Sequence, residues 1–216
     1  MKFTYQGVAH ALQLPDPLPS HYAYTFASAI AAAAGLGIAP EKSLAALAGF
    51  RTPAGRFRLF RGLSDSTIVD SSYNSSPRSL RESLEHFSRL ARRYYRIAVV
   101  GDMRELGLQS KYAHKELADQ VAAAANEVIL FGKETAEYTL PVLSKRGIPV
   151  HHFSQMPELV KYLRARLQPN VWVLVKGSQN TILLERAVEA ILKDPSDVKF
   201  LCRRGRYWDR ILAKTP

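Results

Sequence analysis

Short apolar runs alternate with amphipathic segments along most of the chain. The apolar runs are nearly continuous, which is typical of strands buried on both faces of a parallel sheet; they lie at 96–101, 127–131, 148–153 and 171–175. Between them apolar residues recur every three or four positions, as in helices that cover a sheet; these segments are 79–93, 111–125, 134–146, 157–167 and 181–192. The alternation predicts an α/β fold with a Rossmann-like, open, mostly parallel sheet, flanking helices and right-handed crossovers.

A hairpin pattern precedes this regular part. Phe57 and Leu59 belong to one predicted strand and residues 67–69 to the next, with a turn between them at Gly62–Asp65. The second strand ends at Asp70, and a polar loop then leads to Pro77, whose fixed φ suits the first turn of a helix. At the other end of the chain, residues 200–212 are basic and aromatic and predict a final strand or hairpin.

The first fifty residues have a different pattern. One or two short strands within 3–14 are followed by a proline-rich loop and by two helices, at 22–35 and 40–48. Two short strands and two helices do not easily close a core of their own. We therefore predict a small α+β unit at 1–52, incomplete by itself, followed by a domain at 53–216.

The amino-acid composition indicates which kinds of ligand and which cellular compartment to expect. The net charge of +11 favours anionic ligands such as nucleotides, although most of these charges fit a generally basic surface, so nucleic acid is not the expected partner. The single cysteine, Cys202, fits a reducing compartment, which predicts a cytoplasmic location. No apolar run approaches the roughly 18 residues of a membrane span, so no membrane contact is expected.

Several common motifs are absent from the sequence. Gly101 and Gly107 do not fit the three-glycine spacing of a dinucleotide site, and no glycine-rich loop ends in Gly-Lys-Ser or Gly-Lys-Thr. The six histidines show no zinc spacing. Neither a nicotinamide cofactor nor a metal site held by this chain is expected.

Polar loops follow three of the predicted strands, at 70–77, 102–107 and 176–179. In open α/β sheets ligands bind at the carboxyl ends of strands, so these loops are the candidate site. Arg56 could reach a phosphate with its planar guanidinium, or it could be a surface arginine beside an ordinary hairpin.

The loops together resemble the carboxy-terminal part of the Mur ligases. The motifs that carry the resemblance are Gly55-Arg56, the loop Asp-Ser-Ser-Tyr-Asn-Ser-Ser-Pro at 70–77, Gly-Asp-Met-Arg-Glu-Leu-Gly at 101–107 with His114, and Val-Lys-Gly-Ser at 175–178. They are most similar to the family member that adds D-alanyl-D-alanine to UDP-N-acetylmuramoyl-tripeptide. Residues 21–29 resemble the segment that closes the family's central ATPase domain. The resemblance therefore implies that 1–52 is the tail of that domain and that 53–216 is the C-terminal domain.

By this resemblance the chain is part of an ATP-dependent amide ligase of peptidoglycan synthesis, in which an amine attacks an acyl phosphate. The implied nucleotide-facing residues are Arg56, Asp70, Ser71, Tyr73, Asn74 and Ser76. Lys176 and Ser178 lie where the dipeptide is expected to bind. Asp102, Glu105 and His114 belong to structural loops. Without a ligase role, Asp102 and Glu105 would cap the next helix, His114 would pack between loops, and Lys176 would lie at the surface.

The family's P-loop lysine, magnesium ligands and UDP-binding domain are not found in these residues. ATP and magnesium are therefore expected only together with the missing domains, joined in cis or bound in trans, and the chain is not expected to be catalytic alone.

The sequence also departs from the family pattern at four positions. Ser71 stands where an acid is expected, Ser76 where an asparagine is expected, and Tyr22 and Thr25 replace two asparagines. Serine supplies neither charge nor an amide's paired groups. Three hypotheses stay open: a fragment of a ligase, a natural half-protein, or a degenerate non-catalytic module that binds a protein or nucleic-acid partner.

Overall fold

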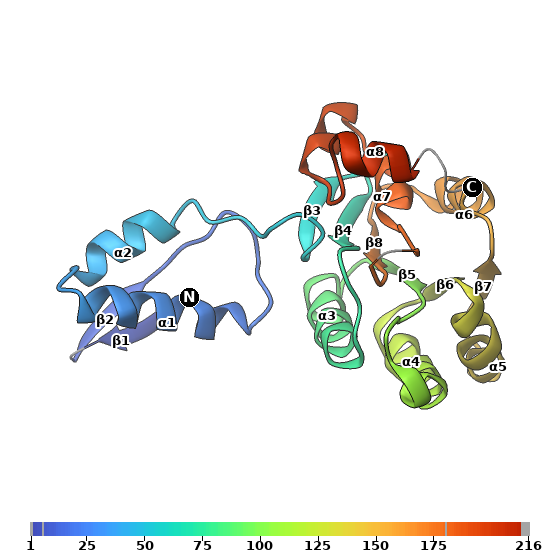
Figure 1. The fold of residues 1–216 in the computed structure, drawn as a ribbon, viewed down its shortest axis with the longest axis horizontal. Helices are drawn as coiled ribbons and strands as arrows, with labels where there is room; N and C mark the ends of the chain where they lie inside the picture. The colour runs from blue at the N-terminus through green and yellow to red at the C-terminus, as the bar shows by residue number, and fades with distance from the viewer. Residues whose placement is uncertain (1, 6, 180, 213–216) are drawn as a thin grey trace. The chain divides into compact units, whose positions relative to one another are not determined.

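The chain forms two compact units in the computed structural model, Met1–Thr52 and Pro53–Pro216 (Figure 1). The structure describes residues 2–5, 7–179 and 181–212. No helix in the described ranges is both long enough and apolar enough to cross a membrane.

The first unit pairs a hairpin with two helices. Strands β1 (Lys2–Tyr5) and β2 (Val8–Ala11) are antiparallel, and helices α1 (Tyr22–Gly35) and α2 (Pro40–Leu47) follow. Its buried core side chains, among the described residues, are Leu12, Phe26 and Ile30. Much of the alanine-rich surface of α1 is exposed, which agrees with the expectation that these elements do not bury a large core by themselves.

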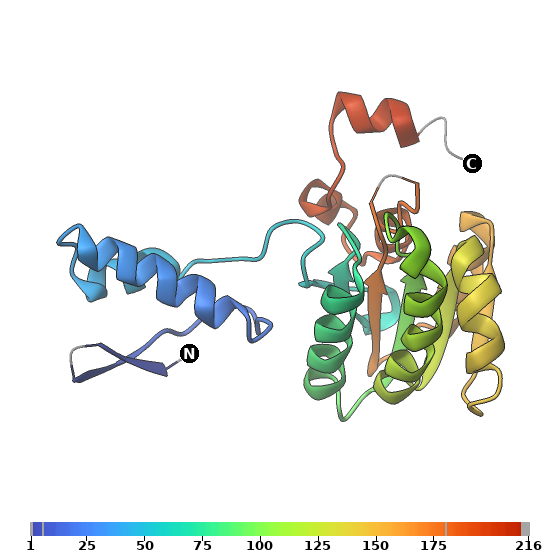
Figure 2. The same ribbon diagram turned by 60° about the horizontal axis from the view of Figure 1, so that its bottom comes forward.

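The second unit is built on a six-stranded sheet of order β3-β4-β8-β5-β6-β7 (Figure 2). The strands are β3 (Arg58–Arg61), β4 (Thr67–Ser71), β5 (Tyr95–Gly101), β6 (Glu127–Phe131), β7 (Val150–Phe153) and β8 (Val171–Lys176). Only the β3–β4 pair is antiparallel among these neighbours; the other four pairs are parallel. The predicted fold class is confirmed.

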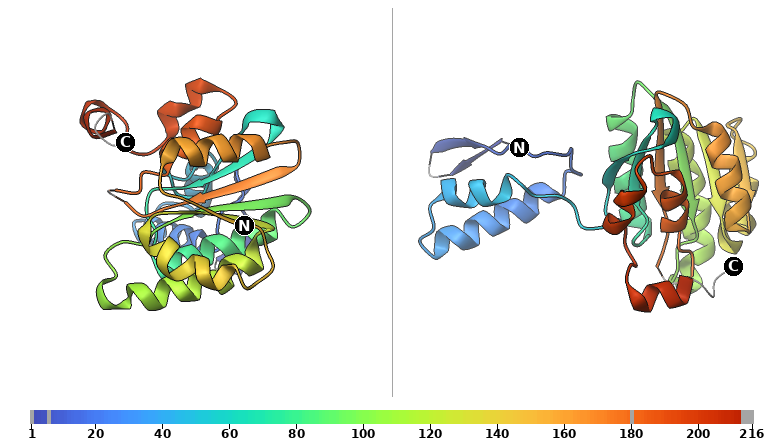
Figure 3. Two further views of the ribbon diagram at one scale, coloured as in Figure 1. Left: turned by 90° about the vertical axis from the view of Figure 1, so that its right-hand side faces the viewer. Right: turned by 90° about the horizontal axis from the view of Figure 1, so that it is seen from above.

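Helices cover both faces of this sheet (Figure 3). On one face α3 (Pro77–Leu90), α4 (Ser110–Ala124) and α5 (Leu140–Leu143) pack through residues such as Phe87, Leu117 and Leu143. On the other face α6 (Met156–Arg166) and α7 (Glu185–Ile191) pack through Leu159 and Ile191. The alternate residues of each buried strand divide between the two cores, which is why the strands read as continuous apolar runs.

Two predicted helices are shorter or less regular than their patterns indicate. The segment after β6 begins as a π-helical turn at Thr135–Thr139 before α5, next to Pro141, which has no N–H to donate. The segment after β8 becomes helical only at Glu185, because Leu183 has φ +47° and lies in the core with its neighbours. Apolar periodicity alone did not reveal either interruption.

The prediction of a final strand or hairpin at 200–212 is wrong. A 3₁₀ segment at Pro195–Phe200 is followed by irregular chain and then by α8 (Arg206–Leu212). Beside β3 this segment forms a bridge between Gly62 and Leu192 and a bond from Lys193 N–H to the Arg61 carbonyl, but it adds no further strand. Cys202 and Arg203 turn inward instead, where both are buried.

Glu127 at the start of β6 is a buried carboxylate held by three donors. Arg166 Nη2 lies 2.8 Å from it, Tyr162 Oη 2.9 Å and Tyr95 Oη 3.1 Å. Burial acts to raise the pKa of Glu127, but these hydrogen bonds and the charge of Arg166 together lower it. A carboxylate whose pKa falls on folding stabilises the fold above its unfolded value of 4.5, and this stabilisation is lost as the pH falls.

We expect Glu127→Gln to lower the free energy of unfolding at pH 7 by about 1–2 kcal/mol, since Arg166 is partly exposed and its charge is screened. The difference from the unmodified protein should shrink below about pH 4.5. Urea unfolding at pH 7 and pH 4 measures both values. Asp119→Asn, which breaks an exposed ion pair with Arg146, is the control and should cost less than about 0.5 kcal/mol. Equal costs for the two variants would contradict the assignment.

Candidate functional site

The predicted loops meet at one edge of the sheet. Strands β4, β8 and β5 are parallel neighbours, so the loops that follow them start side by side at their carboxyl ends. Ser71 at the end of β4 pairs in register with Lys176 at the end of β8, and Val100 pairs with Lys176 from the other side. The sheet therefore brings the 70–77 and 176–179 loops together and places Asp102 beyond the adjacent strand.

Arg56 and Tyr73 form the exposed part of this edge. The Arg56 guanidinium lies 4.6 Å from the centroid of the Tyr73 ring, a cation–π arrangement. Tyr73 N–H donates to the Gly55 carbonyl at 3.1 Å. Gly55 has φ +69°, and a Cβ there would lie 2.8 Å from the Tyr73 nitrogen, so only glycine fits. The Gly-Arg motif thus sets Arg56 against Tyr73.

Lys176 and Ser178 hold the same loop from within. Lys176 Nζ donates to the Asn74 carbonyl at 2.8 Å and lies 3.5 Å from Ser71 Oγ, and Ser178 Oγ donates to Asn74 Oδ1 at 3.3 Å. Lys176 is 2% exposed, so the reading of it as a surface lysine is wrong. Burial, together with the charge of Arg56, lowers the pKa of Lys176 to about 7. Contact of Lys176 or Ser178 with an amine substrate stays a prediction.

The remaining nucleotide-facing candidates are less accessible. Asp70 is fully buried, and its Oδ1 accepts bonds from Ser72 N–H at 3.0 Å and Ser72 Oγ at 2.6 Å. Burial raises the pKa of Asp70 despite these bonds. Ser71 is also buried. Ser76 is the N-cap of α3, in a reciprocal capping pair with Ser79. Asp70, Ser71 and Ser76 therefore shape the loop, while Arg56, Tyr73 and Asn74 present exposed side chains.

The loop after β5 is fixed by two residues of different roles. Asp102 accepts bonds from the N–H groups of Glu134 at 3.1 Å and Thr135 at 2.8 Å. It therefore caps the helical segment after β6, and the prediction that it caps the next helix is wrong. His114 is buried and accepts the Met103 N–H at 3.0 Å through Nε2. His114 thus links helix α4 to the loop after β5.

Glu105 does not cap the next helix either. It has φ +65°, is exposed, and accepts a bond from Gln179 Nε2 at 3.3 Å. The contact links the loop after β5 to the loop after β8. A sequence pattern with an acid just before a helix could not distinguish this link from a cap.

A cavity of about 490 Å³ opens beside these loops, beyond the ends of β5, β6 and β7. Its lining includes four basic side chains, Arg104, Lys133, His152 and Arg186, together with Asp102. No local pattern predicts this cavity, because its basic residues come from the segments that follow β5 and β6, from strand β7 and from helix α7. Across the described residues no group of three or more His, Cys, Asp or Glu side chains is placed to hold a metal ion.

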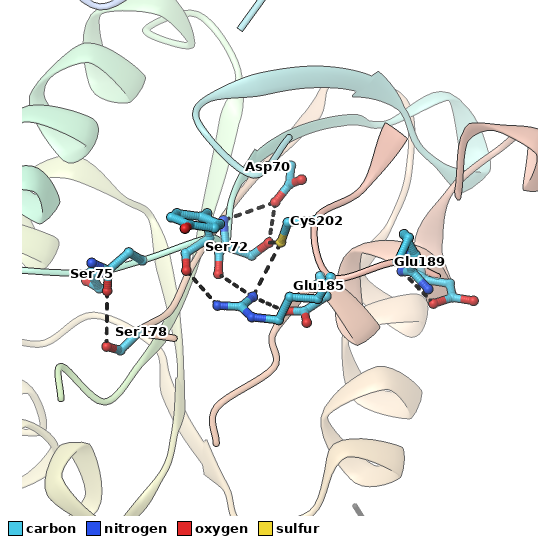
Figure 4. Close-up of polar contacts among 11 residues, drawn as sticks. Asp70, Ser72, Ser75, Ser178, Glu185, Glu189 and Cys202 are labelled. Atoms are coloured by element: carbon cyan, nitrogen blue, oxygen red, sulfur yellow. Dashed lines mark hydrogen bonds and ion pairs between the residues drawn. The ribbon is translucent and has the colours of Figure 1, made fainter. Parts of the chain in front are cut away.

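Sequence reasoning also missed a buried ion pair behind the 70–77 loop (Figure 4). Arg203 Nη1 lies 2.9 Å from Glu185 Oε2, and the two side chains are 3% and 0% exposed. Figure 4 shows Asp70, Ser72 and Cys202 gathered close to Glu185, one member of this pair. Arg203 lies in the basic tail, where one arginine among several carries no signal of burial.

A comparison with known protein families shows to which family the chain belongs. The family described as "Mur ligase, glutamate ligase domain" matches residues 55–179. This chain belongs to the Mur ligase family. The match includes the loops at 70–77, 102–107 and 176–179 and confirms the resemblance.

Individual relatives of this Mur ligase chain are named for one activity. It is 28% identical over 197 residues to the UDP-N-acetylmuramoyl-tripeptide–D-alanyl-D-alanine ligase of Bacillus subtilis, covering 89% of this chain and 42% of the relative. It is 28% identical over 196 residues to the ligase of the same name from Escherichia coli, covering 88% of this chain and 41% of that protein. The chain thus spans about two fifths of the length of these curated relatives.

Among solved structures, the MurF ligase of Thermotoga maritima in complex with ADP matches with a TM-score of 0.71 and 25% identity. The match covers 88% of this chain and 44% of that one. MurF from Acinetobacter baumannii, at 19% identity and a TM-score of 0.73, supports the fold alone.

Proposed function

We propose that this chain is the carboxy-terminal portion of an ATP-dependent amide ligase that adds D-alanyl-D-alanine to UDP-N-acetylmuramoyl-tripeptide in the cytoplasm. Residues 53–216 would close over the nucleotide and bind the amine substrate. Residues 1–52 would complete a central domain whose remainder, like the UDP-binding domain, is supplied in cis or in trans. The chain by itself is not proposed to be catalytic.

The placement of Arg56 carries the proposal. Its guanidinium is exposed at the carboxyl edge of the sheet and lies against the Tyr73 ring. The loop beneath it is ordered by Lys176 and Ser178. A cation held in this way can meet a phosphate without reorganising, which is the condition for stabilising charge in phosphoryl transfer.

In such a ligase the substrate carboxylate is first converted to an acyl phosphate, with release of ADP. The amine then attacks the carbonyl carbon, the amide bond forms, and phosphate leaves. Arg56 would stabilise negative charge on the phosphate oxygens, while the Tyr73 ring holds its guanidinium in position. Magnesium would lower the charge repulsion between phosphates, but the described residues offer no cluster of ligands for it, and no step is assigned to a metal held here.

The basic cavity is a proposed site for the carboxylate of the incoming dipeptide. Arg104 and Arg186 line it, and both are positively charged at neutral pH. It borders Ile182, which lies against Gly101 at the end of β5 and Gly177 just after β8. An arginine fork suits a carboxylate, and the amine end of the dipeptide would then extend toward Arg56.

The test is release of ADP by a reconstituted enzyme. The chain is mixed with, and separately fused to, the part of the Bacillus subtilis relative outside the matched region. ATP, UDP-N-acetylmuramoyl-tripeptide and D-alanyl-D-alanine are then added. We expect ADP release that depends on the dipeptide. If neither the mixture nor the fusion releases ADP, while the intact relative does, the chain is instead a non-catalytic binding module.

A further inference from the structure

The backbone of the 72–74 loop is held from inside by two buried basic side chains, those of Arg203 and Lys176. The carbonyls of three successive residues turn inward: Arg203 donates to Ser72 at 3.4 Å and to Tyr73 at 2.6 Å, and Lys176 donates to Asn74 at 2.8 Å. Lys176 lies within the region matched by the Mur ligase family, whereas Arg203 lies 24 residues beyond its end at 179. Two of these three hydrogen bonds therefore come from a residue outside the family match.

The Arg203 side chain is itself fixed in place. Glu185, at the start of α7, accepts from Nη1 at 2.9 Å, which leaves Nη2 directed at the Tyr73 carbonyl. Both side chains are almost completely buried, and Figure 4 shows Glu185 close to Cys202. Because a guanidinium is planar and rigid, fixing one nitrogen against Glu185 also fixes the direction of the other.

The same segment supports the ring that carries Arg56. The Tyr73 ring has the Arg56 guanidinium at 4.6 Å and the Arg203 guanidinium at 5.6 Å from its centroid. Cys202 Sγ lies 3.6 Å from Ser72 Oγ and would be 3.0 Å from a Cβ on Gly55. The tail thus packs against both segments that set the position of Arg56.

We infer that Arg203 is a positioning residue of the site, which acts through Tyr73 to hold Arg56 where a phosphate binds. The inference rests on the proposed role of Arg56 in the ligase. It adds a part of the chain that the family match does not include. Arg203 itself is buried and is not proposed to touch the nucleotide.

The experiment follows the Arg56 side-chain Nε–H signal by NMR in the full chain. The signal is assigned by its loss in Arg56→Gln, and inorganic tripolyphosphate is the probe. Arg203→Gln removes the guanidinium that donates to both Glu185 and the Tyr73 carbonyl. Arg203→Lys keeps the positive charge but has a single nitrogen to donate to both acceptors. Arg204→Gln is the matched control. Arg204 forms an ion pair with Glu189, one turn further along α7 than Glu185, and not with the 72–74 loop.

Two readouts are expected to change. Before any probe is added, the Arg56 signal should move in Arg203→Gln, because Tyr73 no longer stacks on it in one position. The tripolyphosphate Kd should rise about fivefold, since the phosphate must then order the loop on binding. In Arg204→Gln the signal should stay in place and the Kd should change less than about twofold. A residue that only stabilised the fold would lower the melting temperature without moving either readout in the folded protein.

The two proposals fail in different ways. If tripolyphosphate does not shift Arg56 in the unmodified chain, the phosphate role of Arg56 is wrong, while the probe-free signal still reports on positioning. If Arg203→Gln does not fold, Arg203→Lys provides the same comparison. An Arg56 signal and a Kd that are unchanged in a folded Arg203 variant would overturn the inference.

Discussion

Replacing Arg56 with glutamine is expected to lower the rate of dipeptide-dependent ADP release by roughly 10²–10³-fold in the reconstituted ligase. The guanidinium is exposed, so its loss creates no buried cavity or unpaired charge. Its interaction with developing phosphate charge, by contrast, has no replacement among its neighbours, because Lys176 is buried and bonded to Asn74. The melting temperature should change by less than about 2 °C.

Arg61→Gln is the matched control for this prediction. Arg61 lies on the same strand pair but opposite Thr67, at the far edge of the sheet from the loop. It is also exposed. We expect its ADP release to stay within about twofold of the unmodified protein. Equal activities of the Arg56 and Arg61 variants would remove Arg56 from the site.

The regular part of the fold was predictable because burial on two faces leaves a direct trace in the sequence. The four parallel strands after α3 appear as apolar runs, and the helices between them appear as amphipathic segments. The tail at 200–212 was not predictable in this way. Its course depends on Arg203 meeting Glu185 and the Tyr73 carbonyl, which are contacts between distant residues. No local pattern encodes such contacts.

The order of the strands made it possible to predict which loops form the site. Loops after parallel strands meet at one edge, so 70–77 and 176–179 could be expected to come together. The burial of individual side chains could not be expected. Asp70 and Lys176 stand in polar loops, where exposure is the usual outcome, yet both are turned inward. Polar residues in a loop that is predicted to bind a ligand can therefore be buried, and they can order the loop residues that are exposed.

One of the buried residues that order the 70–77 loop is Lys176, a lysine that is buried near the cation Arg56. Arg56 lies close enough to lower the pKa of Lys176 further, and Asp70 and Glu82 offset the effect only in part. The neutral amine can still donate to the Asn74 carbonyl, so the loop does not depend on the charge. The charged form, however, has to be desolvated whenever the protein folds at low pH.

Stability should therefore rise with pH through the range in which Lys176 loses its proton. The pKa of Lys176 is about 7 in the folded protein and 10.5 as the model value for the unfolded chain. Between these values the unfolded state binds more protons, so the free energy of unfolding increases with pH. The limiting slope is about 1.4 kcal/mol per pH unit, which gives roughly 2–3 kcal/mol between pH 7.5 and 9.5.

Lys176→Met should abolish this increase, because methionine has no proton to release, although it leaves the Asn74 carbonyl without its donor. Urea unfolding at pH 7.5, 8.5 and 9.5 separates the two effects: the lost hydrogen bond shifts the whole curve, whereas the lost titration changes its slope. Lys199→Met, at an exposed lysine, should retain the slope of the unmodified protein. Parallel curves for the unmodified protein and Lys176→Met would show that Lys176 keeps its charge on folding, which contradicts a lowered pKa.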